Sequence, residues 1–325
     1  MQLIECVPNF SEGRNSNVIN AIATSIRAIA GVKLLHIDVG YDAHRSVYTF
    51  AGEPHAVMNA AFASIVCATK LIDMRAHHGT HPRIGACDVC PIVPISGITM
   101  DECKLLAETL ALKVSSLGIP VYMYAQNARS ARRKNLSYIR NGEYELLSNK
   151  MLSEDGKPDY GGNFNPLTGA TVIGARSYML AYNINLGTED VAIAKDIASR
   201  IRESSTLPSL NIKYERLPAV KAIGWYVKEY SCVQVSTNVY NIEKVGMHEV
   251  YESVKYWASY HNVEVHGSEL IGLSPLSCII QAGKYYNPNA IVQSTIIKSA
   301  IDGLGLQSVQ EFIPEKKILE IALKN

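Results

Sequence analysis

The chain has 325 residues, of which 47% are hydrophobic and 19% charged, a composition that is typical of a folded globular protein and excludes global disorder. Lysine and arginine number 31 and aspartate and glutamate 30, so the net charge of +1 provides no long-range field for polyanions, and we expect neither nucleic acid nor a membrane surface as a partner. The seven cysteines are an odd number spread over a long chain, which favours reduced thiols and a cytoplasmic location. The N-terminus lacks a signal-peptide pattern, and no apolar run predicts a membrane span.

The first part of the chain has the element order of a split β-α-β unit. Apolar alternation and helical spacing, interrupted by turn residues, place these elements along the chain. They are a strand at 3–7, a helix at 15–30, strands at 32–39 and 46–51, a helix at 54–70 and a strand at 86–95. This β-α-β-β-α-β order is that of a ferredoxin-like fold.

Further elements follow this unit before the order repeats. Thr99 and Glu102 have the spacing of a capping box and predict a helix to about residue 117, which a strand at 120–125 follows. The glycine- and proline-rich passage 153–169 has no usable period and predicts a long loop, and loops of that length are often functional.

The second half shows the same order of elements again. We expect a strand within 171–186, a helix at 188–203, strands at 222–227 and 232–239, a helix at 247–260 and a strand at 263–271, then peripheral helices at 275–286, 290–301 and 315–323. The sequence therefore predicts an α+β protein of two ferredoxin-like subdomains, residues 1–178 and 179–325, with a ligand cleft between them.

Three of the nine histidines, His77, His78 and His81, lie within five positions on the loop between a predicted helix and a predicted strand. Imidazole titrates near neutral pH, so a histidine held here is a candidate for moving protons to and from a nitrogen. His81 is the first choice because Gly79 and Pro82 restrict the backbone around it. The other interpretation is that these histidines cap the helix or are solvated in the loop, and the residues alone leave it open.

A metal site made of these histidines together with Cys87 and Cys90 is a further alternative. If 86–95 is a strand, the two cysteines are three positions apart and point to opposite faces, which does not suit a zinc knuckle. No second ligand pair occurs elsewhere in the sequence, so we expect no metal.

Charged residues near these segments are candidates for binding a substrate. Asp38 ends an apolar strand, where it would orient an imidazole, bind a cationic nitrogen or serve as an ordinary turn aspartate. Arg45 and Arg83 are candidates for bidentate carboxylate binding. The run from Arg129 to Arg140 is either a solvated helix face or a docking site for a polyanionic tail. The sequence contains no convincing phosphate-binding glycine loop and no G-x-S-x-G elbow, so nucleotide-driven and serine-hydrolase chemistry are not expected.

Several long motifs lie along nearly the whole chain. The main ones are Cys6-Val7-Pro8-Asn9-Phe10-Ser11-Glu12-Gly13, Arg45-Ser46-Val47-Tyr48-Thr49-Phe50, His77-x-Gly79-x-His81-Pro82-Arg83-Ile84-Gly85, Tyr182-Asn183-Ile184-Asn185-Leu186 and Gln234-Val235-Ser236-Thr237-Asn238. In sequence and order they closely resemble the glutamate formimidoyltransferase family, the formiminotransferase part of formiminotransferase-cyclodeaminase.

The resemblance implies transfer of a formimino group between N-formimino-L-glutamate and tetrahydrofolate, in histidine degradation and one-carbon metabolism, by a homodimer. Tetrahydrofolate is then a co-substrate, and no metal takes part. The resemblance also implies that His81 is the catalytic histidine and Asp38 its acidic partner. The residues it implies for contacting folate are Tyr160, Gly161, Gly162, Asn163, Phe164, Asn165, Pro166, Leu167, Thr168 and Gly169, and Arg45 and Arg83 stay candidates for binding the substrate because of their own chemistry.

On this interpretation N5 of the reduced pterin attacks the formimino carbon. His81 takes the proton from the incoming nitrogen and delivers it to the departing amine, while Asp38 stabilises the developing cation. Three alternatives remain: a formyltransferase that acts on N5-formyltetrahydrofolate and glutamate, a metal-dependent amidohydrolase that uses the histidine cluster, and a folate-binding protein without turnover.

Overall fold

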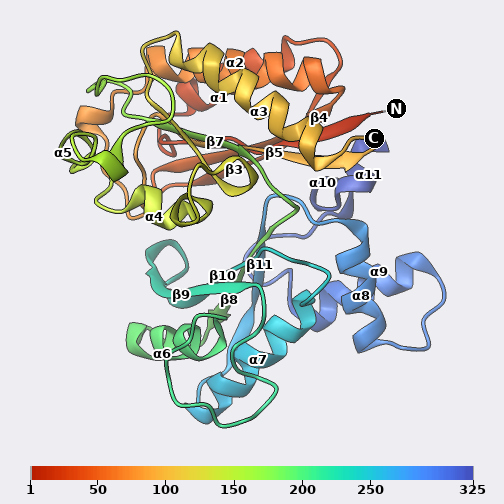
Figure 1. Cartoon of the computed structure of the whole chain (residues 1–325). Coiled ribbons are helices and arrows are strands. Elements are labelled where there is room, and N and C mark those ends of the chain that lie inside the picture. Colours follow the sequence, from red (N-terminus) through yellow and green to blue (C-terminus); the bar gives the residue numbers. More distant parts are fainter. Residues whose placement is uncertain (1, 325) are drawn as a thin grey trace. The chain divides into compact units, whose positions relative to one another are not determined.

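The computed structural model describes residues 2–324, and the chain divides into two compact units, Met1–Ser177 and Tyr178–Asn325. In the colours of Figure 1 the first unit runs from red to green and the second from green to blue. Each unit has its own sheet and its own hydrophobic core. None of the helices within residues 2–324 combines the length and the apolar character that a bilayer crossing needs.

The first unit contains a seven-stranded sheet. Its central elements are β1 (Leu3–Cys6), β2 (Asn9–Phe10), α1 (Ser16–Arg27), β3 (Val32–Gly40), β4 (Arg45–Gly52), α2 (Pro54–Leu71) and β5 (Cys87–Ser96). If β1 and β2 are counted as one interrupted strand, these antiparallel strands lie in the order β3-β4-β1/β2-β5. The expected ferredoxin-like arrangement is therefore confirmed.

Two strands parallel to β5 extend this sheet. After α3 (Met100–Ser115) comes β6 (Val121–Met123), and β7 (Thr171–Ala175) lies between β5 and β6. Between β6 and β7 the chain forms the short helices α4 (Leu136–Arg140) and α5 (Leu147–Lys150). The strand expected within 171–186 is β8 (Leu180–Leu186) of the second sheet, and the sequence did not separate from it β7, which joins the first sheet.

Local sequence explains where the helices of the first unit begin and what they cover. The Asn15 side chain caps α1, and Thr99 and Glu102 form the expected capping box at the start of α3. In that box Glu102 N donates to Thr99 Oγ1 at 3.2 Å, and Thr99 N donates to Glu102 Oε2 at 2.7 Å. The helices bury apolar side chains such as Ile22 and Ile65 in a core with the sheet, so one face of the sheet is covered.

The long passage from 153 to 169 is attached to the first unit at several points. It contains a short 3-10 turn, Glu154–Gly156, and Tyr160 forms an isolated bridge with Val121. Gly169 forms a second bridge, with Gly85, just before β5. The passage is therefore a loop, as expected, whose end lies beside the segment that carries the clustered histidines.

The second unit contains a four-stranded antiparallel sheet. Its elements are β8, α6 (Val191–Ile201), β9 (Val220–Val227), β10 (Cys232–Val239), α7 (Met247–Tyr260) and β11 (Val265–Ile271). The strand order β11-β8-β10-β9 is again ferredoxin-like, as predicted. The helices α8 (Leu276–Tyr286), α9 (Gln293–Leu304), α10 (Pro314–Lys317) and α11 (Leu319–Lys324) follow, so the single helix expected at 315–323 is two short ones.

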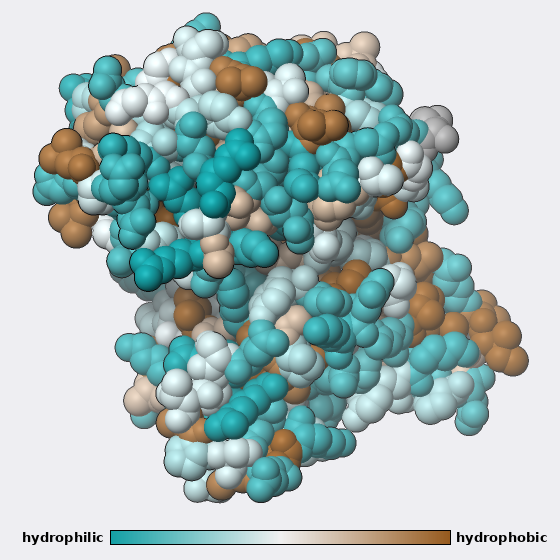
Figure 2. All heavy atoms as spheres, in the orientation of Figure 1, coloured by the Kyte–Doolittle hydropathy of each residue, from teal (hydrophilic) through white to brown (hydrophobic). Residues whose placement is uncertain are grey.

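Most of the surface of both units that is visible in Figure 2 is hydrophilic or neutral, with hydrophobic residues in small groups. One hydrophobic group lies in the region of α8 and α9, whose connection exposes Ile291 and Val292. Scattered exposed hydrophobic residues of this kind are ordinary for a folded protein.

Candidate active site

A β-bulge in β5 determines which side chains reach the face of the first sheet opposite α1, α2 and α3. Asn9 lies opposite Val89 and Phe10 opposite Cys87, so Asp88 is an extra residue in β5 with no partner in β2. Cys87 and Cys90 consequently both pack in the core beneath the helices, and the expectation that they point to opposite faces is wrong. Within residues 2–324 no group of three or more histidine, cysteine or acidic side chains is placed to hold a metal ion.

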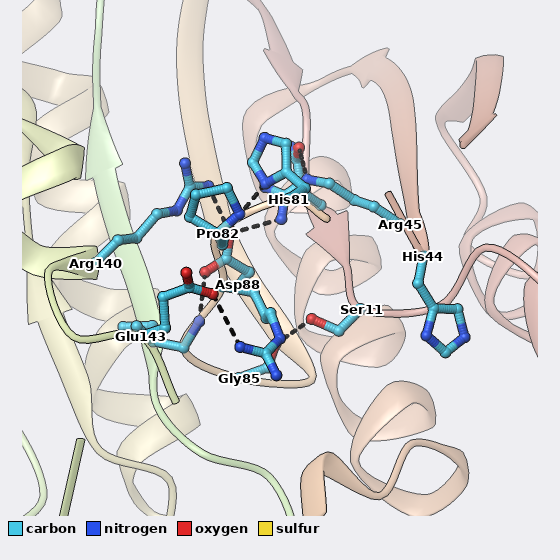
Figure 3. Close-up of polar contacts among 12 residues, drawn as sticks. Ser11, His44, Arg45, His81, Pro82, Gly85, Asp88, Arg140 and Glu143 are labelled. Atoms are coloured by element: carbon cyan, nitrogen blue, oxygen red, sulfur yellow. Dashed lines mark hydrogen bonds and ion pairs between the residues drawn. The ribbon is translucent and has the colours of Figure 1, made fainter. Parts of the chain in front are cut away.

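The bulged Asp88 lies between two arginines from other elements (Figure 3). Its side chain is fully buried, and its Oδ2 accepts from Arg45 Nη1 of β4 at 2.7 Å and from Arg140 Nη2 of α4 at 2.5 Å. Its Oδ1 accepts from the backbone N–H of Ile84 at 3.0 Å. Burial alone would raise the pKa of Asp88, but the charges of Arg140 and Arg45 hold it well below the usual range.

His81 lies next to this cluster, on the loop that precedes β5. Its Nδ1 is 2.8 Å from the carbonyl oxygen of Pro82. A carbonyl oxygen can only accept, so Nδ1 carries the proton and Nε2 keeps its lone pair. Burial, followed by the charges of Arg45 and Arg140, lowers the pKa of His81 to about 3, and Asp88 acts in the opposite direction. At neutral pH His81 is therefore an uncharged base.

The other two clustered histidines have different surroundings. The His77 ring stacks on His44 with centroids 4.2 Å apart, and both of its nitrogens are engaged, Nε2 with His44 O at 2.8 Å and Nδ1 with Arg83 Nε at 3.1 Å. Burial lowers the pKa of His77 to about 4. His78 is exposed. The interpretation that these histidines are structural or simply solvated therefore fits His77, whose nitrogens are both engaged, and His78, which is exposed. It does not account for His81, whose Nε2 makes no hydrogen bond within residues 2–324.

Arg83 has no donor to offer a substrate. A guanidinium has five N–H groups. In Arg83 they bind His77 Nδ1, His77 O, Glu143 Oε2 at 2.9 Å and both oxygens of Glu145 at 2.8 and 2.6 Å. All five hydrogen-bond donors of Arg83 are thus engaged within the protein, and its role in holding a substrate carboxylate stays a prediction. Arg83, Glu143 and Glu145 border an open cavity of about 450 Å³.

Asp38 lies on the face of the first sheet opposite α1, α2 and α3, where it pairs with His36. It pairs across the strands with Val47, which places it on the same face as Arg45. Its Oδ1 is 2.9 Å from His36 Nε2. The charge of the Asp88 carboxylate also acts on His81. The role of Asp38 as acidic partner of His81 stays a prediction.

The segment Tyr160–Gly169 combines anchored and exposed residues. Asn165 Oδ1 accepts from the N–H groups of Leu167 and Thr168 at 3.0 and 3.3 Å, and Phe164 packs on Tyr144 with ring centroids 5.9 Å apart. Five residues of the segment are exposed: Gly161, Gly162, Asn163, Pro166 and Leu167. A ligand that meets this segment would therefore contact mainly the parts 161–163 and 166–167.

The run from Arg129 to Arg140 is not one continuous positive patch. Arg129 pairs with Glu108 at 2.7 Å, Arg133 with Asp159 at 2.8 Å, and Arg140 with Asp88. Much of its charge is therefore balanced inside the first unit, which weakens the idea of a docking site for a polyanionic tail.

Asp88 and Arg140 are the members of the site that sequence reasoning missed. One signal was present: a carboxylate between Cys87 and Val89, in a strand that is otherwise apolar, is rarely buried unless it is paired. The partner Arg140 lies 52 residues further along the chain, and nothing in the sequence links the two.

Comparison with known proteins agrees with this architecture. The model of the N-terminal subdomain of the formiminotransferase domain matches residues 3–176, and the model of the formiminotransferase domain matches residues 181–324. The glutamate formimidoyltransferases of Streptococcus pyogenes serotype M1 and Thermoplasma acidophilum are each 40% identical to this chain over 88% of its length and over 93% and 92% of theirs.

The formimidoyltransferase-cyclodeaminase of Dictyostelium discoideum is 43% identical over 98% of this chain, which spans 60% of the length of that protein. The fold and these matches together define a protein made of the two subdomains of a formiminotransferase domain. The chain belongs to the formiminotransferase family.

Proposed function

We propose that the chain is a glutamate formimidoyltransferase, which moves the formimino group between N-formimino-L-glutamate and tetrahydrofolate in histidine degradation. Two relatives that bear this name match it over more than nine-tenths of their own length. The observation that carries the proposal is the geometry of His81: its Nδ1 is 2.8 Å from Pro82 O, its Nε2 makes no hydrogen bond within the described residues, and it lies beside the cluster of Arg45, Asp88 and Arg140.

His81 has the properties that the transfer requires. N5 of the reduced pterin forms a bond to the formimino carbon, the C=N electron pair moves to nitrogen, and the tetrahedral intermediate then expels the glutamate amine. The attacking nitrogen must lose a proton and the departing one must gain it. His81 Nε2 accepts the first proton and returns it to the second, because Nδ1 is fixed as a donor to Pro82. General acid–base assistance of this kind contributes on the order of 10²- to 10⁴-fold in rate.

The remaining assignments are proposals of the same kind. Tetrahydrofolate is a co-substrate that meets the exposed part of the segment Tyr160–Gly169, and Asp38 supports the developing cation. The protein is a cytoplasmic homodimer with subdomains at residues 1–178 and 179–325, and the ligand cleft between them stays a prediction. The formiminotransferase fold and the exposed 161–163 backbone support the folate assignment.

A transfer assay tests the function directly. The purified chain is supplied either with tetrahydrofolate and N-formimino-L-glutamate or, to test the formyltransferase alternative, with N5-formyltetrahydrofolate and glutamate. Formimino transfer by the wild type is expected, with a fall of at least about 100-fold in kcat for His81→Gln. His55→Gln is the matched control, because His55 is an exposed histidine on α2. Near-wild-type turnover of His81→Gln would remove His81 from its role, formyl transfer alone would identify the formyltransferase, and folate binding without turnover would identify a binding protein.

A further inference from the structure

The cluster below His81 contains more positive than negative charge. Arg45 and Arg140 share one carboxylate, that of Asp88, and their side chains are only 8% and 14% exposed. A buried charge without a counter-charge is costly, so such clusters are usually balanced. Burial lowers the pKa of Arg45 to about 10, although the charge of Asp88 acts in the opposite direction. A lowered pKa is expected for a buried cation whose charge is not fully balanced. The cluster therefore has room for one further negative charge.

The two arginines also have hydrogen-bond donors to spare. Arg45 uses Nε for Asn9 at 3.0 Å and Nη1 for Asp88, and Arg140 uses Nη2 for Asp88. Arg140 Nε is buried and has no hydrogen-bond partner among residues 2–324. This differs from Arg83, in which all five N–H groups are engaged within the protein. A planar, singly charged acceptor suits both the spare donors and the missing charge.

We propose that Arg45 and Arg140, held together by Asp88, form a subsite for a carboxylate, and that its occupant is the α-carboxylate of the glutamate moiety. This inference rests on the proposed formimino transfer. The α-carboxylate is bonded to the same carbon as the nitrogen that exchanges the formimino group, so a substrate that reaches His81 brings this group to the neighbouring arginines. The glutamate tail of folate also ends in carboxylates, but it lies at the far end of that molecule from N5.

Occupation of the subsite changes His81. The charged groups that act on its imidazole include Arg45 from β4, Arg140 from α4 and Asp88 from β5, and Asp38 of β3 lies on the same face of the sheet as Arg45. Both arginines disfavour the protonated ring, and a carboxylate bound to them offsets that repulsion. The pKa of His81 therefore rises when the glutamate moiety binds, so the ring becomes a better proton acceptor at the moment when a proton has to be moved.

The kinetic test compares Arg140→Gln and Arg140→Lys with the wild type. Loss of a hydrogen bond to a charged group raises KM for N-formimino-L-glutamate on the order of 10- to 100-fold in Arg140→Gln. KM for tetrahydrofolate is expected to stay within about twofold, and Arg140→Lys should recover part of the loss because it keeps the charge. Arg75→Gln is the matched control, because Arg75 is an exposed arginine of the same unit that also pairs with an aspartate, Asp73.

A second test does not need turnover. The His81 ring signals are identified by their absence from the NMR spectrum of His81→Gln, and their chemical shifts are followed at pH 7, where glutarate is a dicarboxylate, as this probe is added at constant ionic strength. Glutarate is expected to shift the His81 ring signals in the wild type but not in Arg140→Gln, and the neutral glutaramide should have no effect.

The outcomes separate the two proposals. If the wild type transfers formimino groups while both KM values are unchanged in Arg140→Gln and glutarate leaves His81 unaffected, the subsite is refuted and the function stands. If Arg140→Gln raises only the KM for polyglutamated folate, the subsite binds a carboxylate of the folate tail, and the assignment to the glutamate moiety of the substrate is overturned. If the wild type transfers nothing, the proposed function fails, and the glutarate titration still decides whether the subsite binds a carboxylate. That titration of the wild type also decides the matter if Arg140→Gln does not fold.

Discussion

Replacing Asp88 with asparagine removes the charge that balances Arg45 and Arg140 and changes little else. The new side chain has nearly the same shape, and its oxygen can still accept from Ile84 N, as Asp88 Oδ1 does at 3.0 Å. Asp88 is fully buried and its arginine contacts are 2.7 and 2.5 Å long, so the variant leaves two cations buried without a counter-charge. Removal of one partner from a buried pair costs about 3–5 kcal/mol.

The corresponding change in Tm is large enough to measure. For a protein unit of this size, residues 1–177, each kcal/mol corresponds to roughly 2–4 °C, so a fall of about 6–20 °C is expected at pH 7. Differential scanning calorimetry of the whole chain measures it. Asp73→Asn is the control, because Asp73 pairs with Arg75 at the exposed surface, and its Tm should match that of the wild type.

The dependence on pH gives a second check. The folded state holds the pKa of Asp88 well below its usual value, so the stability it contributes is complete above the unfolded pKa of about 3.9 and is lost as the pH falls further. The difference in Tm between the wild type and Asp88→Asn should therefore be constant near neutral pH and shrink below about pH 4. A variant that melts within about 1 °C of the wild type at pH 7 would refute the argument that the cluster depends on this charge.

Two further predictions concern the backbone near the site and the helix start that the sequence identified. Gly169→Ala should lower the stability by more than about 1 kcal/mol, because Gly169 has φ +64° and an added Cβ would lie 2.1 Å from Ile84 O, whereas Gly162→Ala, with no atom within 4 Å, should leave the Tm nearly unchanged. Thr99→Ala should cost about 0.5–2 kcal/mol in urea unfolding by removing the capping box of α3, and an unchanged midpoint would contradict that role of the Thr99 side chain.

The parts of the structure that follow from local chemistry were predictable from the sequence. Thr99 and Glu102 lie three residues apart, so their capping box forms within one turn of helix, and the order of strands and helices follows from periodicities that each segment contains in itself. The boundary between β7 and β8 was missed, because both segments are apolar and only their pairing with different sheets separates them.

The site was predictable only in part, for a related reason. His81 could be selected because its own neighbours restrict the loop. The pairing of Asp88 with two arginines could not be predicted, because the bulge that displaces Asp88 depends on the register between β2 and β5. A prediction from the alternation of side chains within one strand assumes that no residue is inserted. The sequence does not distinguish Arg83 from Arg140. Only the positions of Glu143 and Glu145 in the structure show that the hydrogen-bond donors of Arg83 are all engaged.

The bridge between Gly85 and Gly169 affects how variants of this protein should be interpreted. An added Cβ at Gly85 would lie 2.1 Å from Ala170 O, so each of the two glycines permits a main-chain approach that any larger residue prevents. A substitution at either position would push the histidine-bearing loop away from the segment that begins at Tyr160. If such a variant is inactive, the cause would be the increased distance between these two backbone segments. The loss of activity would be no evidence that either glycine takes part in the reaction.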